Sequence, residues 1–253
     1  VARIRDLTDR AFAGDPTGDP AFDALGLLLT EVAIPRAVID DIVAGFDLDA
    51  ADWRPRSEQD LLRYSYHVAG AVGVAMALVM GVAPDDERTL DRASDLGIAF
   101  QLSNIARDVA EDAAADRCYL PVDWLVELDI PPGQHMHPAF RSRLSVMARW
   151  LAEMAGEYEA SARWGARKLP PRSRWALLAA TGIYGDIARE VRRRGGMLLY
   201  LLVMLLAGLA TYGVLWALLF PLLGVFIMPG PKSETSFDVG GRADVGLGFE
   251  DDD

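Results

Sequence analysis

The chain has 253 residues, of which 51% are hydrophobic and 25% charged, and this composition excludes both a disordered chain and one embedded in a membrane throughout. The formal net charge of −12 argues against a nucleic-acid partner, because binding a phosphate backbone requires clustered Lys and Arg. The same charge is compatible with a diphosphate substrate, since divalent cations can bridge carboxylates to that anion.

Up to about residue 195 the sequence predicts helices, and the alternating β-branched runs typical of strands are absent. Proline and glycine clusters divide this region into segments. The expected helices, in chain order, are two short ones on either side of a turn at 14–20, one from Pro35 to about Phe46, and longer ones at about 58–81, 87–112, 138–168 and 172–193.

The segment from Met197 to Met228 contains no charged residue, and about 20 apolar residues suffice to span a bilayer. Arginines precede this segment and an acidic tail follows it, so the positive-inside rule places the helical part on the cytoplasmic side of a membrane. A re-entrant pair of short helices and a buried core helix are the alternatives. We therefore expect a helical domain at 1–195, a membrane segment at 196–229 and an acidic disordered tail at 230–253.

The clearest chemical pattern lies on the second long helix, at Gln101, Asn104, Asp108 and Asp112. At 100° per residue these side chains lie within an arc of about 80° on one helical face. Two carboxylates at i, i+4 with an Asn one turn earlier can share hard cations, and such cations can polarise a diphosphate leaving group. On the pattern alone, the solvated face of an acidic helix is the alternative, although two amides on the stripe make it less typical of such a face.

Two other acidic groups are alternative candidates for a cation site. Asp91 and Asp95 repeat the same spacing on the same helix. At 1.5 Å per residue they lie about 25 Å and about 20 Å along the axis from Asp108, so they cannot share a cation with it, and we expect them to be solvated. An acidic run at 40–52 has Gly45 at the position that would complete an i, i+4 pair with Asp41.

Two histidines, His135 and His137, lie in a proline-rich stretch and are candidate metal ligands by residue type. We expect no Cys, Asp or Glu to lie near them and complete a metal site. The sequence therefore predicts a surface loop at this position.

Longer stretches carry a family resemblance. The run Asp91–Asp108, continuing through 111–112 to Arg117–Pro121, resembles the second aspartate-rich signature of phytoene synthases. Residues 64–73, Tyr-Ser-Tyr-His-Val-Ala-Gly-Ala-Val-Gly, resemble the other signature helix of that family. From Val1 to about Arg194 the chain is thus similar to the squalene/phytoene synthase family, and closer to its phytoene branch. The resemblance implies an all-α isoprenoid synthase bundle around a central cavity.

The resemblance also implies roles for individual residues. It implies Mg²⁺ binding, with Mn²⁺ as the alternative ion, by Asp108, Asp112 and Asn104. It implies catalytic roles for Asp108, Asp112, Arg107, Tyr64 and Tyr184. It implies contacts with the diphosphate end of the substrate for Gln101, Asn104, Arg107, Arg117 and Tyr119, and with the prenyl chain for Val68, Ala69, Val72 and Gly73. Helix packing is the alternative role for the small residues, in particular Gly70 and Gly73.

The reaction that the resemblance implies is the head-to-head condensation of two geranylgeranyl diphosphates, through a cyclopropylcarbinyl diphosphate, to phytoene in carotenoid biosynthesis. It implies no nicotinamide cofactor, and it makes the membrane and other enzymes of the pathway the expected partners. Farnesyl diphosphate, giving a squalene-type product, is the alternative substrate. A membrane-anchored, non-catalytic subunit is the alternative class, because the first aspartate-rich helix of the family precedes the region that corresponds to Val1.

Overall fold

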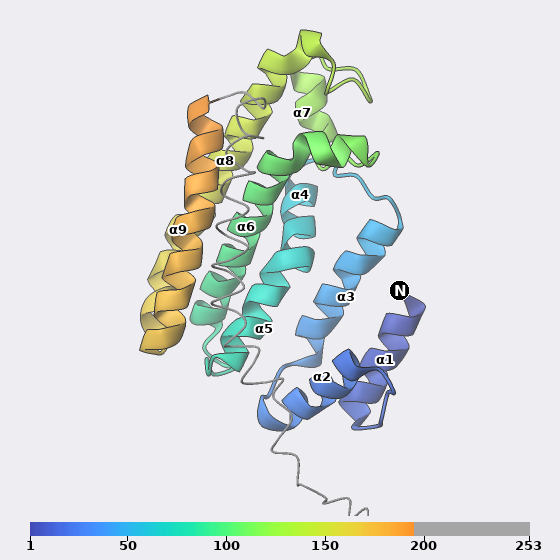
Figure 1. Ribbon diagram of the computed structural model, residues 1–253, viewed down its shortest axis with the longest axis vertical. Helices are drawn as coiled ribbons and strands as arrows, with labels where there is room; N and C mark the ends of the chain where they lie inside the picture. Colours follow the sequence, from blue (N-terminus) through green and yellow to red (C-terminus); the bar gives the residue numbers. More distant parts are fainter. Residues whose placement is uncertain (195–253) are drawn as a thin grey trace, which may run out of the picture. The chain divides into compact units, whose positions relative to one another are not determined.

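The computed structural model describes residues 1–194, and every regular element among these residues is a helix (Figure 1). The all-helical prediction is therefore confirmed for this part of the chain. All described residues belong to one compact unit, Val1–Ala207. The predicted membrane segment at 196–229 and the predicted tail at 230–253 lie outside the described residues.

The helical elements follow the predicted ranges closely, with breaks at the prolines and glycines that suggested them. They are, in chain order, α1 (Ala2–Ala13), α2 (Pro20–Glu31), α3 (Arg36–Ala50), α4 (Glu58–Ser65), the π-helix η1 (Tyr66–Gly70), α5 (Ala71–Val79), α6 (Glu87–Ala114), α7 (Val122–Glu127), the 3₁₀-helix η2 (Pro138–Phe140), α8 (Arg141–Gly165), the 3₁₀-helix η3 (Ala166–Lys168) and α9 (Pro171–Arg194).

Side-chain caps fix where several of these helices begin. Asp19, Ser57 and Asp86 each accept a hydrogen bond from a backbone N–H in the first turn of the helix that follows. Such a cap satisfies one of the donors left unpaired at a helix start and stabilises it by about 1 kcal/mol. The caps thus fix the residues at which α2, α4 and α6 begin, and with them the ends of the preceding loops.

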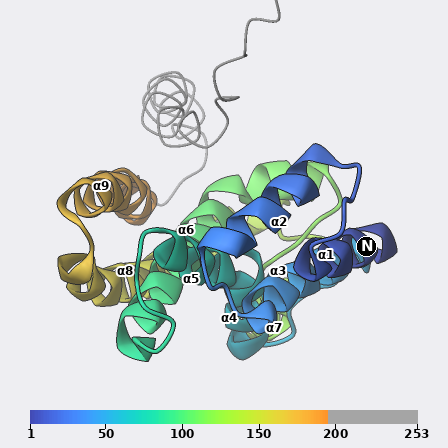
Figure 2. The same ribbon diagram turned by 90° about the horizontal axis from the view of Figure 1, so that it is seen from below.

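Helix α6 is the centre of the described part. It packs against α8 on one side and against α4, η1 and α5 on the other, with α9 beside α8 (Figures 1 and 2). Because neighbours cover α6 on several sides, its buried residues are not confined to one stripe. Leu102 of α6 is fully buried together with Met147 and Leu151 of α8. Burying each such side chain contributes about 1.5–3 kcal/mol, so the α6–α8 contact dominates the core.

Two glycines let α6 approach the helix before it. A Cβ atom added to Gly97 would lie 2.1 Å from the backbone oxygen of Ala69, and one added to Gly73 would lie 2.3 Å from that of Ala93. Both distances are below any real contact, and backbone atoms cannot move aside as a flexible side chain can. The two helices therefore touch backbone to backbone at this seam.

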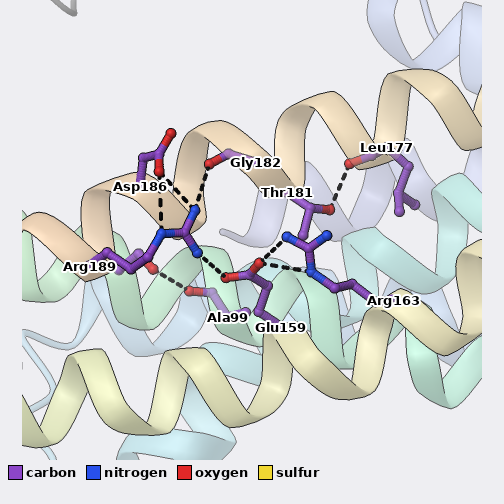
Figure 3. A network of polar contacts seen from close by, with 9 residues as sticks. Ala99, Glu159, Arg163, Leu177, Thr181, Gly182, Asp186 and Arg189 are labelled. Carbon is purple, nitrogen blue, oxygen red and sulfur yellow. Dashed lines mark hydrogen bonds and ion pairs between the residues drawn. The ribbon is translucent and has the colours of Figure 1, made fainter.

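Helices α8 and α9 are joined by a buried carboxylate, that of Glu159 on α8, whose side chain is 11% exposed. Its Oε1 accepts from Arg163 Nη2 at 2.6 Å, and its Oε2 lies 3.9 Å from Nη1 of Arg189 on α9 (Figure 3). Gly185 makes room for this contact, because a Cβ there would lie 2.4 Å from Oε2. We call Glu159, Arg163 and Arg189 the α8–α9 clamp.

Within residues 1–194, one helical stretch, Glu58–Val79, is long and apolar enough by composition to cross a membrane. This stretch is α4, η1 and α5, which pack against α3 and α6. A core helix passes the same test of length and composition, and these contacts are those of a core helix.

Candidate functional site

The predicted ligand face lies on the C-terminal half of α6. Asp108 and Asp112 are both partly buried there, one helical turn apart. Burial in the first place, and the negative charge of Asp108 in the second, raise the pKa of Asp112 to about 6, although Arg117 and Arg107 act in the opposite direction. Two carboxylates in such proximity disfavour each other's charge, and a bound cation would relieve that repulsion.

Asp108 is held by its sequence neighbour. Nε of Arg107 donates to Oδ1 at 2.5 Å and Nη2 donates to Oδ2 at 2.6 Å, so the guanidinium grips both carboxylate oxygens. Both side chains are about three-quarters buried. Such a two-bond pairing fixes geometry as well as charge. Arg107, predicted to face the diphosphate, thus lies against one of the predicted metal ligands.

Asn104 lies one turn before Asp108, and its Oδ1 atom is buried with no hydrogen-bond partner among the described residues. A buried polar atom without a partner carries a free-energy cost of about 1–3 kcal/mol, so its presence calls for an explanation. A cation that this oxygen coordinates would supply one. Gln101, a further turn back, is half-buried, and its proposed contact with the diphosphate stays a prediction.

The donor set of this face suits Mg²⁺, which prefers carboxylate and carbonyl oxygens and usually takes one or two carboxylates together with phosphate oxygens and water. Within residues 1–194, no three His, Cys, Asp or Glu side chains converge on a point where they could hold an ion by themselves. Asp108, Asp112 and Asn104 could supply only part of the coordination shell of such an ion.

Next to Asp112, a cavity of about 10 Å³ lies between α6 and the segment that follows it. Arg117, Cys118, Tyr119 and His135 are among its lining residues. A cavity of this size holds about one water molecule, so it is no substrate pocket. It nevertheless shows that two predicted diphosphate contacts, Arg117 and Tyr119, lie beside Asp112.

The prediction of a surface loop is wrong for His135, which is buried. Its residue is only 8% exposed, and Asp112 and Cys118 line the same cavity, so acidic and thiol groups do lie near it. Burial, and the positive charge of Arg54 to a smaller extent, lower the pKa of His135. The sequence hides this placement, because the loop returns to α6 from more than 20 positions away. His137, by contrast, is exposed, as predicted.

Aromatic rings continue the site on the other side of Tyr119. Tyr64 of α4 stacks between Trp53 and Tyr119, with ring centroids 5.5 and 5.0 Å apart and planes within about 21°. The hydroxyl of Tyr64 donates to Oδ1 of Asp49 at 2.8 Å, and that of Tyr119 reaches the same oxygen at 3.5 Å. Burial above all, and then hydrogen bonds with Tyr119 and with Asp49, raise the pKa of Tyr64 well above its ordinary value, so its hydroxyl stays protonated.

The residues predicted to line the prenyl channel fall into two groups. Val72 is 39% exposed on α5, and Val68 and Ala69 are partly buried in η1. Gly73, however, faces the backbone of α6, as described above, so its role is the helix packing that the sequence left open. Tyr184 of α9 stacks on Phe100 of α6, with centroids 4.0 Å apart, and so contacts the residue before Gln101.

Three acidic residues outside the predicted set have specific partners. Asp49 and Asp41, from the acidic run on α3, accept from Tyr64 and Tyr66 respectively. Asp95, expected to be solvated, is instead bound by Arg92 and by Ser161 of α8, which makes it a link between helices. From the sequence, these residues look like a charged surface. The partners that bind them from other helices lie 15 to 66 positions away in the sequence.

The model of the squalene/phytoene synthase family matches residues 1–206. The chain is 46% identical over 197 residues to a phytoene synthase of Pseudescherichia vulneris, a match that covers 78% of this chain and 63% of the relative. It is 46% identical over 177 residues to a 15-cis-phytoene synthase of Enterobacter agglomerans, covering 70% and 59%. The chain thus spans less than two thirds of the length of these curated relatives.

Solved structures give the same picture of the fold. The squalene synthase HpnC of Alicyclobacillus acidocaldarius superposes with a TM-score of 0.67 at 23% identity, over 76% of this chain and 72% of that one. A dehydrosqualene synthase in complex with a ligand superposes with a TM-score of 0.67 at 27% identity, over 76% and 66%. Most of this chain therefore has the same helical fold as these two solved structures.

Proposed function

Because the chain belongs to the squalene/phytoene synthase family, we propose that it carries the second metal-binding wall of an enzyme that joins two geranylgeranyl diphosphates head to head to give phytoene. The relatives named phytoene synthase, at 46% identity, favour this product over a squalene-type one. The observation that carries the proposal is the ligand face of α6, where Asp108, Asp112 and the unpartnered Asn104 oxygen lie in succession.

The side chains of Asp108, Asp112 and Asn104 would hold Mg²⁺, with Mn²⁺ as the alternative ion, and the bound ion would supply the Lewis acidity for the departure of a diphosphate. Arg117 and Tyr119, beside Asp112, would orient the diphosphate oxygens from the segment after α6. Arg107 binds both carboxylate oxygens of Asp108 and so fixes the orientation of this ligand, and we expect it also to face the diphosphate oxygens.

The allylic cation that remains needs a dry and electron-rich surrounding, since water would quench it. Tyr119 is the last ring of the stack that Trp53 and Tyr64 begin, and the face that it turns away from Tyr64 would attract a cation. Val68, Ala69 and Val72 provide apolar surface for the prenyl chain, and Tyr184 with Phe100 forms an aromatic wall on the α9 side. The double bond of the second substrate attacks the cation, and loss of one proton closes the ring of a cyclopropylcarbinyl diphosphate. Departure of its diphosphate, rearrangement of the resulting cation and loss of a second proton give phytoene.

The direct test is incubation of the purified chain with geranylgeranyl diphosphate and Mg²⁺ in lipid, with hydrocarbon product and released diphosphate both measured. Phytoene would support the proposal, and farnesyl diphosphate in parallel would show which chain length the cavity accepts. If the chain is silent, an N-terminal aspartate-rich helix is added, since the chain spans 63% of its phytoene synthase relative. Silence of the extended chain as well would overturn the enzymatic proposal in favour of a non-catalytic subunit of the pathway.

We further propose that the uncharged segment from Met197 to Met228 anchors the chain in a membrane with the helical domain on the cytoplasmic side. A hydrocarbon product must enter a bilayer, so an anchor would shorten its path, and contact with other carotenoid enzymes would follow from the shared surface. Membrane fractions washed at alkaline pH should retain the chain. Release into the supernatant would contradict the anchor.

A further inference from the structure

The carboxylate of Asp49, on the last turn of α3, lies where two predicted site tyrosines meet. Its Oδ1 accepts the hydroxyl of Tyr64 at 2.8 Å and lies 3.5 Å from that of Tyr119. The two rings stack on each other, and Trp53 covers the outer face of Tyr64. One carboxylate therefore fixes two hydroxyls whose rings are already held by stacking.

A hydroxyl has one proton, so a phenol that donates to one side can only accept on the other. A carboxylate oxygen such as Oδ1 of Asp49 accepts the Tyr64 proton, so the Tyr64 oxygen is left with two lone pairs that can only accept. Burial, then hydrogen bonds with Tyr119 and with Asp49, raise the pKa of the Tyr64 hydroxyl, which therefore keeps its proton.

We propose that Asp49 is a positioning residue that keeps the Tyr64 hydroxyl turned toward α3, so that Tyr64 presents an oxygen lone pair, and not a hydrogen, to the reacting prenyl chain. This rests on the proposed function, in which a carbocation forms beside that ring. An oxygen lone pair turned to a cation stabilises it, whereas an O–H hydrogen in the same place repels it. Asp49 acts on the reaction only through Tyr64.

The same helix supplies a matched control. Asp41, two turns earlier on α3, accepts from the hydroxyl of Tyr66 at 2.6 Å and contacts His67 as well. This bond joins α3 to η1 in the same way, but no ring stack connects Tyr66 to Tyr119. Removing Asp41 should loosen the fold about as much as removing Asp49 without altering the orientation of Tyr64.

The experiment is a double-mutant cycle on turnover with geranylgeranyl diphosphate and Mg²⁺. Asp49→Leu and Tyr64→Phe should each lower kcat about 10- to 100-fold, with KM changed less than about threefold, since misplacement of one group has effects of this size. The double variant should be no slower than Tyr64→Phe alone. Asp49→Asn keeps an acceptor oxygen and should stay within about threefold of the unmutated chain.

The control pair, Asp41→Leu and Tyr66→Phe, should leave kcat within about threefold. Multiplicative effects of Asp49→Leu and Tyr64→Phe would overturn the proposal, as would an Asp49→Asn variant as slow as Asp49→Leu. If the unmutated and extended chains show no turnover, the proposed function fails, and the orientation is then read from near-ultraviolet circular dichroism. Asp49→Leu should change the signal of the stacked rings and Asp41→Leu should not, and identical spectra would reject the assignment.

Discussion

Partly buried carboxylates gather in two regions of the bundle, and the positive charge around them differs. At the α8–α9 clamp, Glu159 is 11% exposed and lies between two guanidiniums, those of Arg163 and Arg189. On the ligand face of α6, Asp108 is paired with Arg107, but the pKa of Asp112 is raised to about 6 by burial and by Asp108. The clamp is complete as it stands, whereas the α6 face is short of positive charge.

This difference separates a structural cluster from a functional one. A fully paired buried carboxylate holds two helices in register and has little further capacity to bind. The α6 face contains a carboxylate whose charge is not fully compensated and an amide oxygen, that of Asn104, without a hydrogen-bond partner among the described residues. Such a cluster destabilises the fold until a cation binds.

The largest effect should come from the α6 face. Asp108→Ala or Asp112→Ala, made in the active form of the chain, should lower turnover by at least about 1,000-fold, because each removes a ligand of the ion that stabilises the leaving group. Steady-state rates across a Mg²⁺ titration would measure this. Asp91→Ala is the matched control, because Asp91 is an exposed carboxylate on the same helix and should leave the rate within about twofold. Equal losses for Asp91 and Asp108 would contradict the site.

The clamp should respond in stability. Glu159→Leu leaves two arginines without their buried partner, and breaking such a pair costs up to about 3–5 kcal/mol. Both guanidiniums are about half exposed and can turn to water, so we expect a loss of about 1–3 kcal/mol in the free energy of unfolding. Urea unfolding would measure it, with the exposed Glu157→Leu on the same helix as the control. A clamp variant as stable as this control would show that the pairing is dispensable.

Asp112→Asn, in contrast, should increase the free energy of unfolding of the metal-free chain. The folded-state pKa of Asp112, about 6, lies above the unfolded value of 3.8, so the folded state binds the proton more tightly and loses stability as pH rises between these values. Above pH 6 the penalty is complete, and replacing the carboxylate should gain about 1 kcal/mol. Thermal unfolding in EDTA at pH 7 and pH 4 should show a gain of a few degrees at pH 7 only. Destabilisation at pH 7 would mean that Asp112 is already compensated.

The smallest effect concerns His135 beside the same cavity. Its folded-state pKa is lowered, so the unfolded state binds the proton more tightly and stability is lost as pH falls below the ordinary value of 6.5. Since Asp112 works in the opposite direction in this window, the test belongs in the Asp112→Asn background. There His135→Asn should flatten the decline of melting temperature between pH 7 and pH 5. An unchanged slope would show that His135 is not the titrating group.

The helices and the ligand face were predictable because both depend on local rules. Prolines such as Pro35 mark helix starts, and a period of 100° per residue places Asp108 and Asp112 on one face. The burial of His135 and the contact of Asp49 with Tyr64 were not predictable. They depend on how a loop and α3 return to residues distant in sequence, and periodicity contains no information on such returns.

Gly73 shows where a local signal is ambiguous. A small residue leaves room either for a ligand or for another helix, and its spacing is the same in both cases. The structure places α6 in that room. The family resemblance brought the prenyl-channel interpretation, and only tertiary packing could decide between the two.

The π-helix η1, Tyr66–Gly70, sets the rotational phase between two functions of one continuous helix. Upstream of it, Tyr64 turns to α3, and downstream Gly73 turns to α6. A π-turn contains one residue more than an α-turn, so deleting a single residue here would rotate the two halves by about 100° against each other. Either the hydroxyl or the glycine would then face the wrong neighbour. The number of residues in η1 is therefore constrained as strictly as the identity of a side chain is elsewhere in the molecule.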